Sequence, residues 1–199
     1  MSKAERTRQF IVEKTAPIFN TKGFAGTSIN DIIKATGLTK GSIYGNFENK
    51  DEVALASFDY NFEKVVVYIR AKMETRNSII DKLLVYPETY RNYLKLPFLN
   101  SGCPVTNTAA EADDTHLLLK AKAANAYTFW KNALERQLKS GIENGEIKPG
   151  TNINEFIAVL ISLIQGGVLQ SKATGKITSL NLSMDYLEKI ITDLKNKKI

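Results

Sequence analysis

Apolar residues recur at three- to four-residue spacing along most of the chain, which is the period of an amphipathic helix. In the first quarter, Phe10, Ile18 and Phe19 fall on one side of such a helix, and Gly23 follows as a stop. Later in the chain, Pro87 interrupts one apolar run and predicts a kink there. The pattern predicts helices over residues 4–22, 28–36, 39–46, 50–74, 78–94, 105–113, 116–144, 153–174 and 182–196.

Clean alternation of apolar and polar residues, the pattern typical of strands, does not occur, and neither does an internal repeat. We therefore expect an all-α fold of about nine helices. Three short helices come first and a larger helical body follows, with the break near Lys50. The predicted domains cover residues 1–49 and residues 50–199.

Helix-capping residues bracket the second and third helices closely. Thr27 or Ser28 can cap the start of the second helix, and Gly37 can end it with positive φ. Thr39 can then cap the third helix after a turn of three to four residues. Two short helices joined by a short turn that contains glycine have the layout of a helix-turn-helix motif.

Charge and composition narrow the function. The chain of 199 residues has a net charge of +6, and its first fifty residues carry eight Lys and Arg against four Asp and Glu, which favours an anionic partner. A single cysteine and a single histidine exclude an intrachain disulfide and a Cys/His zinc site, so we expect no catalytic residues, no metal and no cofactor. The longest near-apolar run has 14 residues, short of the roughly 20 that a membrane span needs, which predicts a soluble, cytoplasmic protein.

The third predicted helix has one polar and one apolar side. Ile43 and Phe47, four residues apart, can anchor it to the core, which leaves the polar residues free to face a DNA groove. Lys50 opens the next helix, where its charge and the helix N-terminus together suit a phosphate. An ordinary solvated helix face is the alternative explanation of these charges.

The stretch Gly37-Leu38-Thr39-Lys40-Gly41-Ser42-Ile43-Tyr44-Gly45-Asn46-Phe47-x-Asn49-Lys50, preceded by Lys22-Gly23-Phe24 and Thr27-Ser28, resembles the DNA-binding domain of the tetracycline-repressor (TetR) family. The resemblance covers about residues 8–55. It departs from the family at Gly45, where many members carry a larger side chain, and at Asn46, where His or Tyr is common. Around Gly102-Cys103-Pro104 a shorter match is similar to one subgroup of the family's regulatory domains.

The resemblance implies an all-α homodimer with an N-terminal DNA reader and a C-terminal ligand-binding body. By position, it places Thr27 and Ser28 on the DNA backbone, Lys50 on a phosphate, and the third helix in the groove. The predicted DNA-binding residues are Thr27, Ser28, Thr39, Lys40, Gly41, Ser42, Tyr44, Asn46 and Lys50.

A small-molecule inducer is expected among the helices over about 55–144, where aromatic residues are frequent. Because the excess positive charge lies in the DNA reader, the inducer is predicted to be neutral and hydrophobic. The candidate ligand-binding residues are Phe62, Tyr90, Tyr93, Asn107, Glu111, Tyr127 and Trp130. Most buried aromatic residues belong to a core, which is the alternative explanation.

The helix over 153–174 is apolar on nearly all sides, so one of its faces is expected to need a partner. The helix over 182–196 adds a second apolar stripe, and two such helices from each chain would form a four-helix bundle about a twofold axis. The predicted dimer-interface residues are Phe156, Leu160, Leu163, Gly167, Met184, Leu187 and Ile191.

These features together predict a ligand-responsive transcriptional regulator, a repressor that leaves a palindromic double-stranded operator when a small molecule binds. The alternative is a helical co-regulator that keeps the fold without binding DNA.

Overall fold

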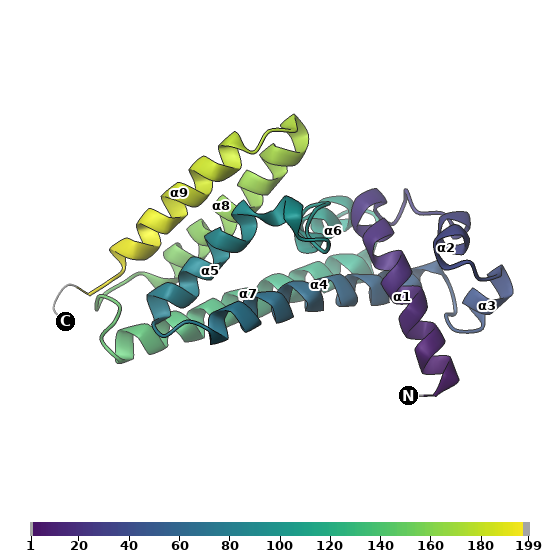
Figure 1. Cartoon of the computed structure of the whole chain (residues 1–199), viewed down its shortest axis with the longest axis horizontal. Coiled ribbons are helices and arrows are strands. Elements are labelled where there is room, and N and C mark those ends of the chain that lie inside the picture. The colour runs from purple at the N-terminus through teal and green to yellow at the C-terminus, as the bar shows by residue number, and fades with distance from the viewer. Residues whose placement is uncertain (1, 197–199) are drawn as a thin grey trace. The chain divides into compact units, whose positions relative to one another are not determined.

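A computed structural model describes residues 2–196, and its regular structure is helical apart from an isolated bridge between Ile147 and Lys195. Nine α-helices and one short 3-10 helix follow one another within these residues (Figure 1). They are α1 (Lys3–Lys22), α2 (Ile29–Thr36), α3 (Lys40–Tyr44), α4 (Lys50–Glu74), α5 (Ile79–Arg91), η1 (Tyr93–Lys95), α6 (Pro104–Ala112), α7 (Leu117–Glu143), α8 (Ile153–Thr174) and α9 (Thr178–Asp193). The all-α prediction is confirmed.

The described chain divides into two compact units. Within the described residues, the first runs from residue 2 to Val65 and also includes Pro97–Ala126, and the second consists of Val66–Leu96 and the residues from Tyr127 to Asn196. The two long helices α4 and α7 each contribute to both units. The predicted domain boundary at Lys50 stays a prediction.

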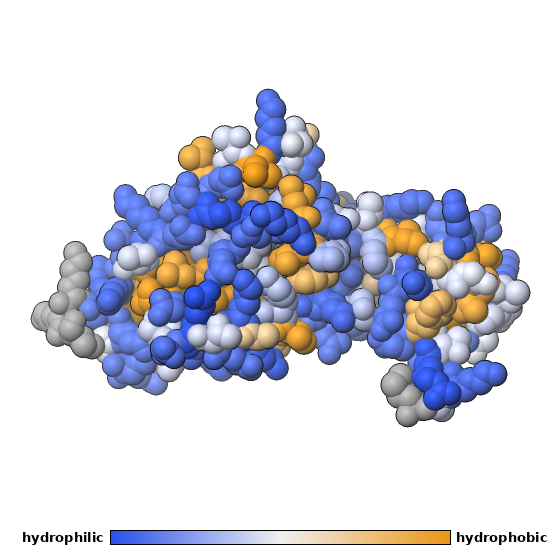
Figure 2. Space-filling view, viewed as in Figure 1, coloured by the Kyte–Doolittle hydropathy of each residue, from blue (hydrophilic) through white to orange (hydrophobic). Residues whose placement is uncertain are grey.

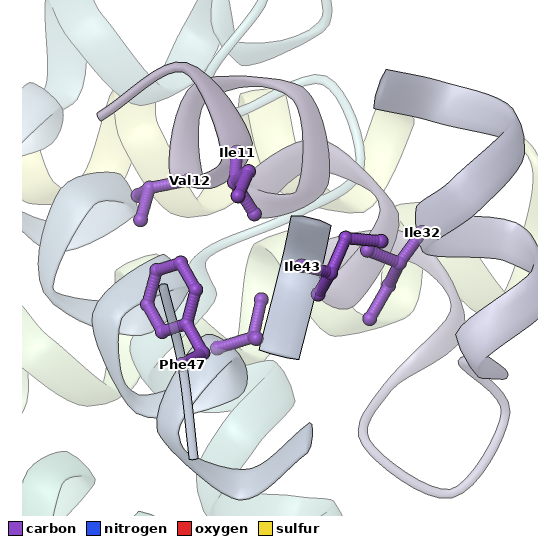
Figure 3. Packing of buried hydrophobic residues seen from close by; sticks show 6 residues of the cluster. Ile11, Val12, Ile32, Ile43 and Phe47 are labelled. Carbon is purple, nitrogen blue, oxygen red and sulfur yellow. The ribbon is translucent and has the colours of Figure 1, made fainter. Parts of the chain in front are cut away.

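The first three helices and the start of α4 share one apolar core, and each of these four helices contributes at least one buried side chain to it. Figure 3 shows Ile43 of α3 beside Ile32 of α2, with Phe47 below Val12 of α1. Ile32 and Ile43 are completely buried. The core cluster consists of Ile11, Val12, Ile32, Ile43, Phe47 and Val53. Ile43 and Phe47 are both buried in this cluster, which confirms the prediction that they anchor α3 to the core.

The ends of these helices are set by the residues that the sequence indicated. Ser28 and Asp31 form a reciprocal capping box at the start of α2, which selects Ser28 over Thr27 as the cap. Gly37 ends α2 in the left-handed conformation at φ 68°, and Gly23 ends α1 at φ 73°. Thr39 caps α3, whose Ser42 amide donates to the threonine hydroxyl.

Helices α5, α8 and α9 pack together in the second unit. Pro87 lies inside α5, whose helix continues to Arg91 before the separate 3-10 turn. α9 begins at Thr178, four residues before the predicted start. α8 is the one described helix that is long and apolar enough to cross a membrane by length and composition, and it packs on α9.

Most residues predicted for the dimer interface are buried inside this single chain, and their role in a dimer stays a prediction. Leu160, Met184, Leu187 and Ile191 have no exposed surface, and Phe156 is 8% exposed. A Cβ added at Gly167 would lie 2.9 Å from Leu180 of the same chain. The apolar stripe of α9 therefore packs against α8 and α5 of its own protomer. Of the predicted set, Leu163 alone keeps a half-buried position.

Other hydrophobic side chains of α8 and α9 do face solvent in the described chain. Their exposed fractions are 57% for Leu169, 65% for Leu182 and 53% for Tyr186. Gly166 points into open space, since an added Cβ would meet no atom within 4 Å. Figure 2 shows hydrophilic side chains over most of the face it presents, with hydrophobic ones gathered in patches.

Candidate nucleic-acid interface

The exposed side of α3 carries polar residues that were predicted to face DNA. Lys40, Gly41 and Tyr44 are exposed, and Ser42 is half-buried, while Ile43 between them points into the core. The Lys40 ammonium lies 5.9 Å from the centroid of the Tyr44 ring. The helix thus presents an ammonium and a phenol side by side, and the Ser42 hydroxyl is partly accessible. These groups can donate to phosphate oxygens or to base edges.

Gly41 has no structural reason to be a glycine. Its φ is not positive, and an added Cβ would meet only Thr39 Oγ1, at 4.0 Å. By contrast, a Cβ at Gly45 would approach the Gly41 carbonyl oxygen at 3.3 Å. The absence of a side chain at position 41 leaves the backbone there open to the close approach of another molecule.

Three residues of the predicted DNA-binding set are committed to contacts within the protein. Thr27 is fully buried, and its hydroxyl donates to the Gly23 carbonyl at 2.6 Å. The Asn46 side-chain amide donates to the Ser42 carbonyl at 2.9 Å. Lys50 Nζ donates to the carbonyls of Phe24 and Thr27 at 2.9 and 3.0 Å and lies 4.0 Å from the centroid of the Phe24 ring.

Arg8 contacts the segment that follows the end of α3. Its guanidinium donates to the Asn46 carbonyl and to the Glu52 carboxylate, and it lies 4.0 Å over the Phe47 ring. The pKa of Glu52 is lowered, first by the backbone N–H of Glu48 and then by Arg8. Because Arg8 and Glu52 lie 44 residues apart, no local spacing in the sequence could reveal this brace.

The start of α2 is ordered by charge as well as by its cap. Lys22 Nζ lies 2.6 Å from Asp31 Oδ1, and Ser28 donates to the same carboxylate through its amide and its hydroxyl. Lys22 contributes most to lowering the pKa of Asp31 far below its usual range, and the hydrogen bonds from Ser28 lower it further. The Ser28 hydroxyl therefore serves this capping network and remains exposed.

The predicted ligand-binding residues are divided between the two units. Phe62, Asn107 and Glu111 belong to the first unit, where Phe62 stacks on Phe58 with ring centroids 6.3 Å apart. Asn107 and Glu111 are hydrogen-bonded to the end of α1 and the turn after it. A cavity of about 20 Å³ in this unit, large enough for one water molecule, lies beside Phe19, Asn61 and Glu111.

The other candidates lie in the second unit, where aromatic side chains from α5 and α7 meet. The ring of Trp130 is 6.1 Å from that of Tyr86 and 6.0 Å from that of Tyr90. Burial raises the pKa of the Tyr86 phenol. The Tyr93 hydroxyl is hydrogen-bonded to Ser171 at 3.0 Å, and Tyr127 is half-buried. Tyr86 joins this aromatic group, although it was not among the predicted ligand-binding residues.

Comparison with known proteins places the chain in a family. Residues 11–56 match bacterial regulatory proteins of the tetR family, and residues 80–187 match the tetracyclin repressor-like C-terminal domain. The chain therefore belongs to the TetR family, as its sequence predicted, and is a DNA-binding transcriptional regulator with a C-terminal ligand-binding domain.

Two solved structures share this fold over nearly the whole chain. A TetR-family regulator from Cytophaga hutchinsonii is 44% identical, with a TM-score of 0.95 over 100% of this chain and 99% of its own. A TetR regulator from Chloroflexus aurantiacus J-10-fl is 34% identical, with a TM-score of 0.91 over 98% of both chains. The transcriptional repressor DhaR of Mycobacterium sp. (strain GP1) is 23% identical, over 83% of this chain and 82% of its own.

Proposed function

We propose that this protein is a homodimeric repressor that binds a palindromic operator through α3 and leaves it when a small molecule binds. The exposed polar side of α3 supports this proposal most strongly, because Lys40, Gly41 and Tyr44 face solvent while Ile43 is locked in the core. Ser42 and Thr39 complete the surface that meets the groove. Two such helices about 34–36 Å apart would read half-sites one turn of B-DNA apart.

In this proposal, Lys50 and Arg8 stabilise the helix-turn-helix motif and do not contact DNA. Lys50 and Arg8 hold the two ends of the helix-turn-helix motif through carbonyl oxygens, and Thr27 is buried beneath it. Affinity for the phosphate backbone then comes from Lys40 and from the other exposed lysines, such as Lys34. Ser28, exposed at the start of α2, stands where the resemblance puts a backbone contact.

Dimerisation is proposed through the outward faces of α8 and α9. Leu182 and Tyr186 are one helical turn apart on α9 and point away from the stripe that α9 buries in its own protomer. Leu163 and Gly166 of α8 are both half-buried. The space beside Gly166 is open, so a second helix can approach closely there. An isologous contact between two protomers would bury these exposed apolar side chains and remove them from water.

The inducer is proposed to be a neutral, hydrophobic small molecule, and the protein is proposed to act in the cytoplasm. Tyr86, Tyr90 and Trp130 form the buried aromatic group that best suits an apolar ligand. The family consists of transcriptional regulators, and we propose that this chain has no catalytic activity.

Gly41→Ala gives the sharpest test, because the fold tolerates the added methyl group. The variant should keep the wild-type melting temperature and lose specific binding, measured by fluorescence anisotropy on a palindromic duplex that the wild type has selected from random DNA. If Gly41→Ala bound this duplex like the wild type, the role of the exposed side of α3 in reading DNA would be refuted. If the wild type selected no duplex at all, the alternative of a co-regulator that does not bind DNA would be favoured.

A further inference from the structure

A polar junction joins the end of α1 to the segment that opens α6, within the first unit. The Asn20 amide donates to the Gly102 carbonyl at 3.1 Å, and Asn107 of α6 donates to both the carbonyl and the side-chain oxygen of Asn20 at 3.1 and 2.9 Å. The hydroxyls of Thr21 and Ser101 are 2.8 Å apart. Directional hydrogen bonds, rather than apolar contacts alone, therefore fix how α6 meets α1.

Glu111 extends this junction to the turn between α1 and α2. Its Oε2 accepts the amide hydrogen of Phe24 at 2.8 Å, and its Oε1 accepts that of Ala25 at 2.9 Å. Both amides follow the last residue of α1, where the chain leaves the helix. A carboxylate that accepts two backbone N–H groups makes charge-assisted bonds with a defined direction.

Gly23 is matched to this carboxylate. A Cβ added at Gly23 would lie 2.3 Å from Glu111 Oε2, and the backbone there has a φ of +73°. A side chain at position 23 and the carboxylate of Glu111 therefore exclude one another. The glycine is required both by the turn and by the acid that approaches it.

The same turn is held from its other side by Lys50. Its ammonium binds the carbonyls of Phe24 and Thr27, so the amides of the turn go to α6 and its carbonyls go to α4. Thr27 directly precedes Ser28, the cap of α2. The His116 ring also meets the edge of the Phe24 ring, with centroids 4.5 Å apart. The start of the helix-turn-helix motif is thus set by these two charged side chains.

We propose that Glu111, assigned from the sequence to the ligand site, is instead a positioning residue for the DNA reader. Its carboxylate fixes the turn after α1 and with it the direction in which α2 and α3 leave that turn. Because Glu111 belongs to α6, a displacement of α6 reaches the reader through these two hydrogen bonds. This inference rests on the proposed function, since it assumes that α3 reads DNA.

The test compares Glu111→Ala and Glu111→Gln with Asp114→Asn, which removes one negative charge at an exposed position just after α6. Amide hydrogen exchange of residues 24–27 is measured together with affinity for the selected palindromic duplex and for an unrelated duplex, each at several salt concentrations. The alanine variant should exchange faster in this turn and lose about tenfold in specific affinity, comparable with one mismatched base pair. The glutamine variant, with one oxygen left to accept, should fall between.

Affinity for the unrelated duplex and the salt dependence of DNA binding should stay unchanged, because replacing Glu111 removes no phosphate contact. A role confined to stability would lower the melting temperature without changing the ratio of specific to non-specific affinity, and that result would overturn the inference. Should the alanine variant unfold, the glutamine variant must still lower this ratio. Absence of specific binding by the wild type would overturn the proposed function, whereas specific binding that is insensitive to Glu111 would overturn only the positioning role.

Discussion

Replacing Lys50 by methionine separates two roles for this residue. The resemblance to the TetR family implies a phosphate contact, but the structure shows Nζ donating to the carbonyls of Phe24 and Thr27 at 2.9 and 3.0 Å. The ammonium also lies over the Phe24 ring. Methionine keeps most of the aliphatic stem and removes the charge and all three donors, so the substitution tests the donors rather than the packing.

The expected cost follows from these contacts. A hydrogen bond from a charged group contributes about 1.5–3 kcal/mol, but the two carbonyls here are only partly buried, so water can replace the lost donor. Discounting for that replacement leaves a loss of roughly 2 kcal/mol for the pair of bonds together. In a chain of this length, a loss of about 2 kcal/mol lowers the melting temperature by roughly 4–8 °C.

Thermal unfolding followed by circular dichroism measures this loss, and anisotropy titrations across a salt series measure DNA binding. Lys148→Met, at an exposed position in the turn before α8, is the matched control and should leave both unchanged. We expect Lys50→Met to melt earlier and to bind operator DNA more weakly, with the same salt slope as the wild type. A slope that fell by about 0.9 at an unchanged melting temperature would show a lost phosphate contact and refute the brace.

Three further outcomes are expected. Gly23→Ala should cost at least about 1 kcal/mol in chemical denaturation, because the methyl group meets the Glu111 carboxylate at a positive φ. Asp31, whose pKa is lowered in the folded state, contributes stability that is complete above its ordinary value of 3.8 and is lost as the pH falls below it, so Asp31→Asn should flatten this acid limb in unfolding curves from pH 5 to 2.5. Leu182→Glu should give a folded monomer by light scattering, whereas Leu187→Glu should unfold the second unit, because it buries a charge.

Local signals in the sequence were sufficient for most helix ends. Ser28, Gly37 and Thr39 act on residues within one helical turn of themselves, so their effect can be predicted without knowledge of the fold. The start of α9 escaped prediction because Ile177, in the capping position, makes no side-chain cap hydrogen bond. The apolar stripe of α9 was found, but periodicity does not say whether such a stripe faces its own chain or a partner.

The candidate site was predictable where it depends on short spacing. Lys40 and Tyr44 are four residues apart and therefore fall on one side of α3 by helical geometry alone, and the apolar character of Ile43 predicts its burial. The contacts of Arg8 with Glu52 and of Glu111 with Phe24 join residues 44 and 87 positions apart. Such pairings depend on how the helices pack, so the sequence alone placed Glu111 in a ligand site and did not predict the contacts of Arg8.

The most direct test of the account is a selection of random-sequence DNA by the wild-type protein, repeated with Lys40→Ala and Gly41→Ala. Because a symmetric dimer presents two copies of α3, the wild type should enrich an inverted repeat whose half-sites lie about 10 base pairs apart. The Gly41 variant should enrich no repeat, and the Lys40 variant should enrich a weaker or altered one. Enrichment of the same repeat by all three proteins, or of none by the wild type, would contradict the claim that the exposed side of α3 reads DNA.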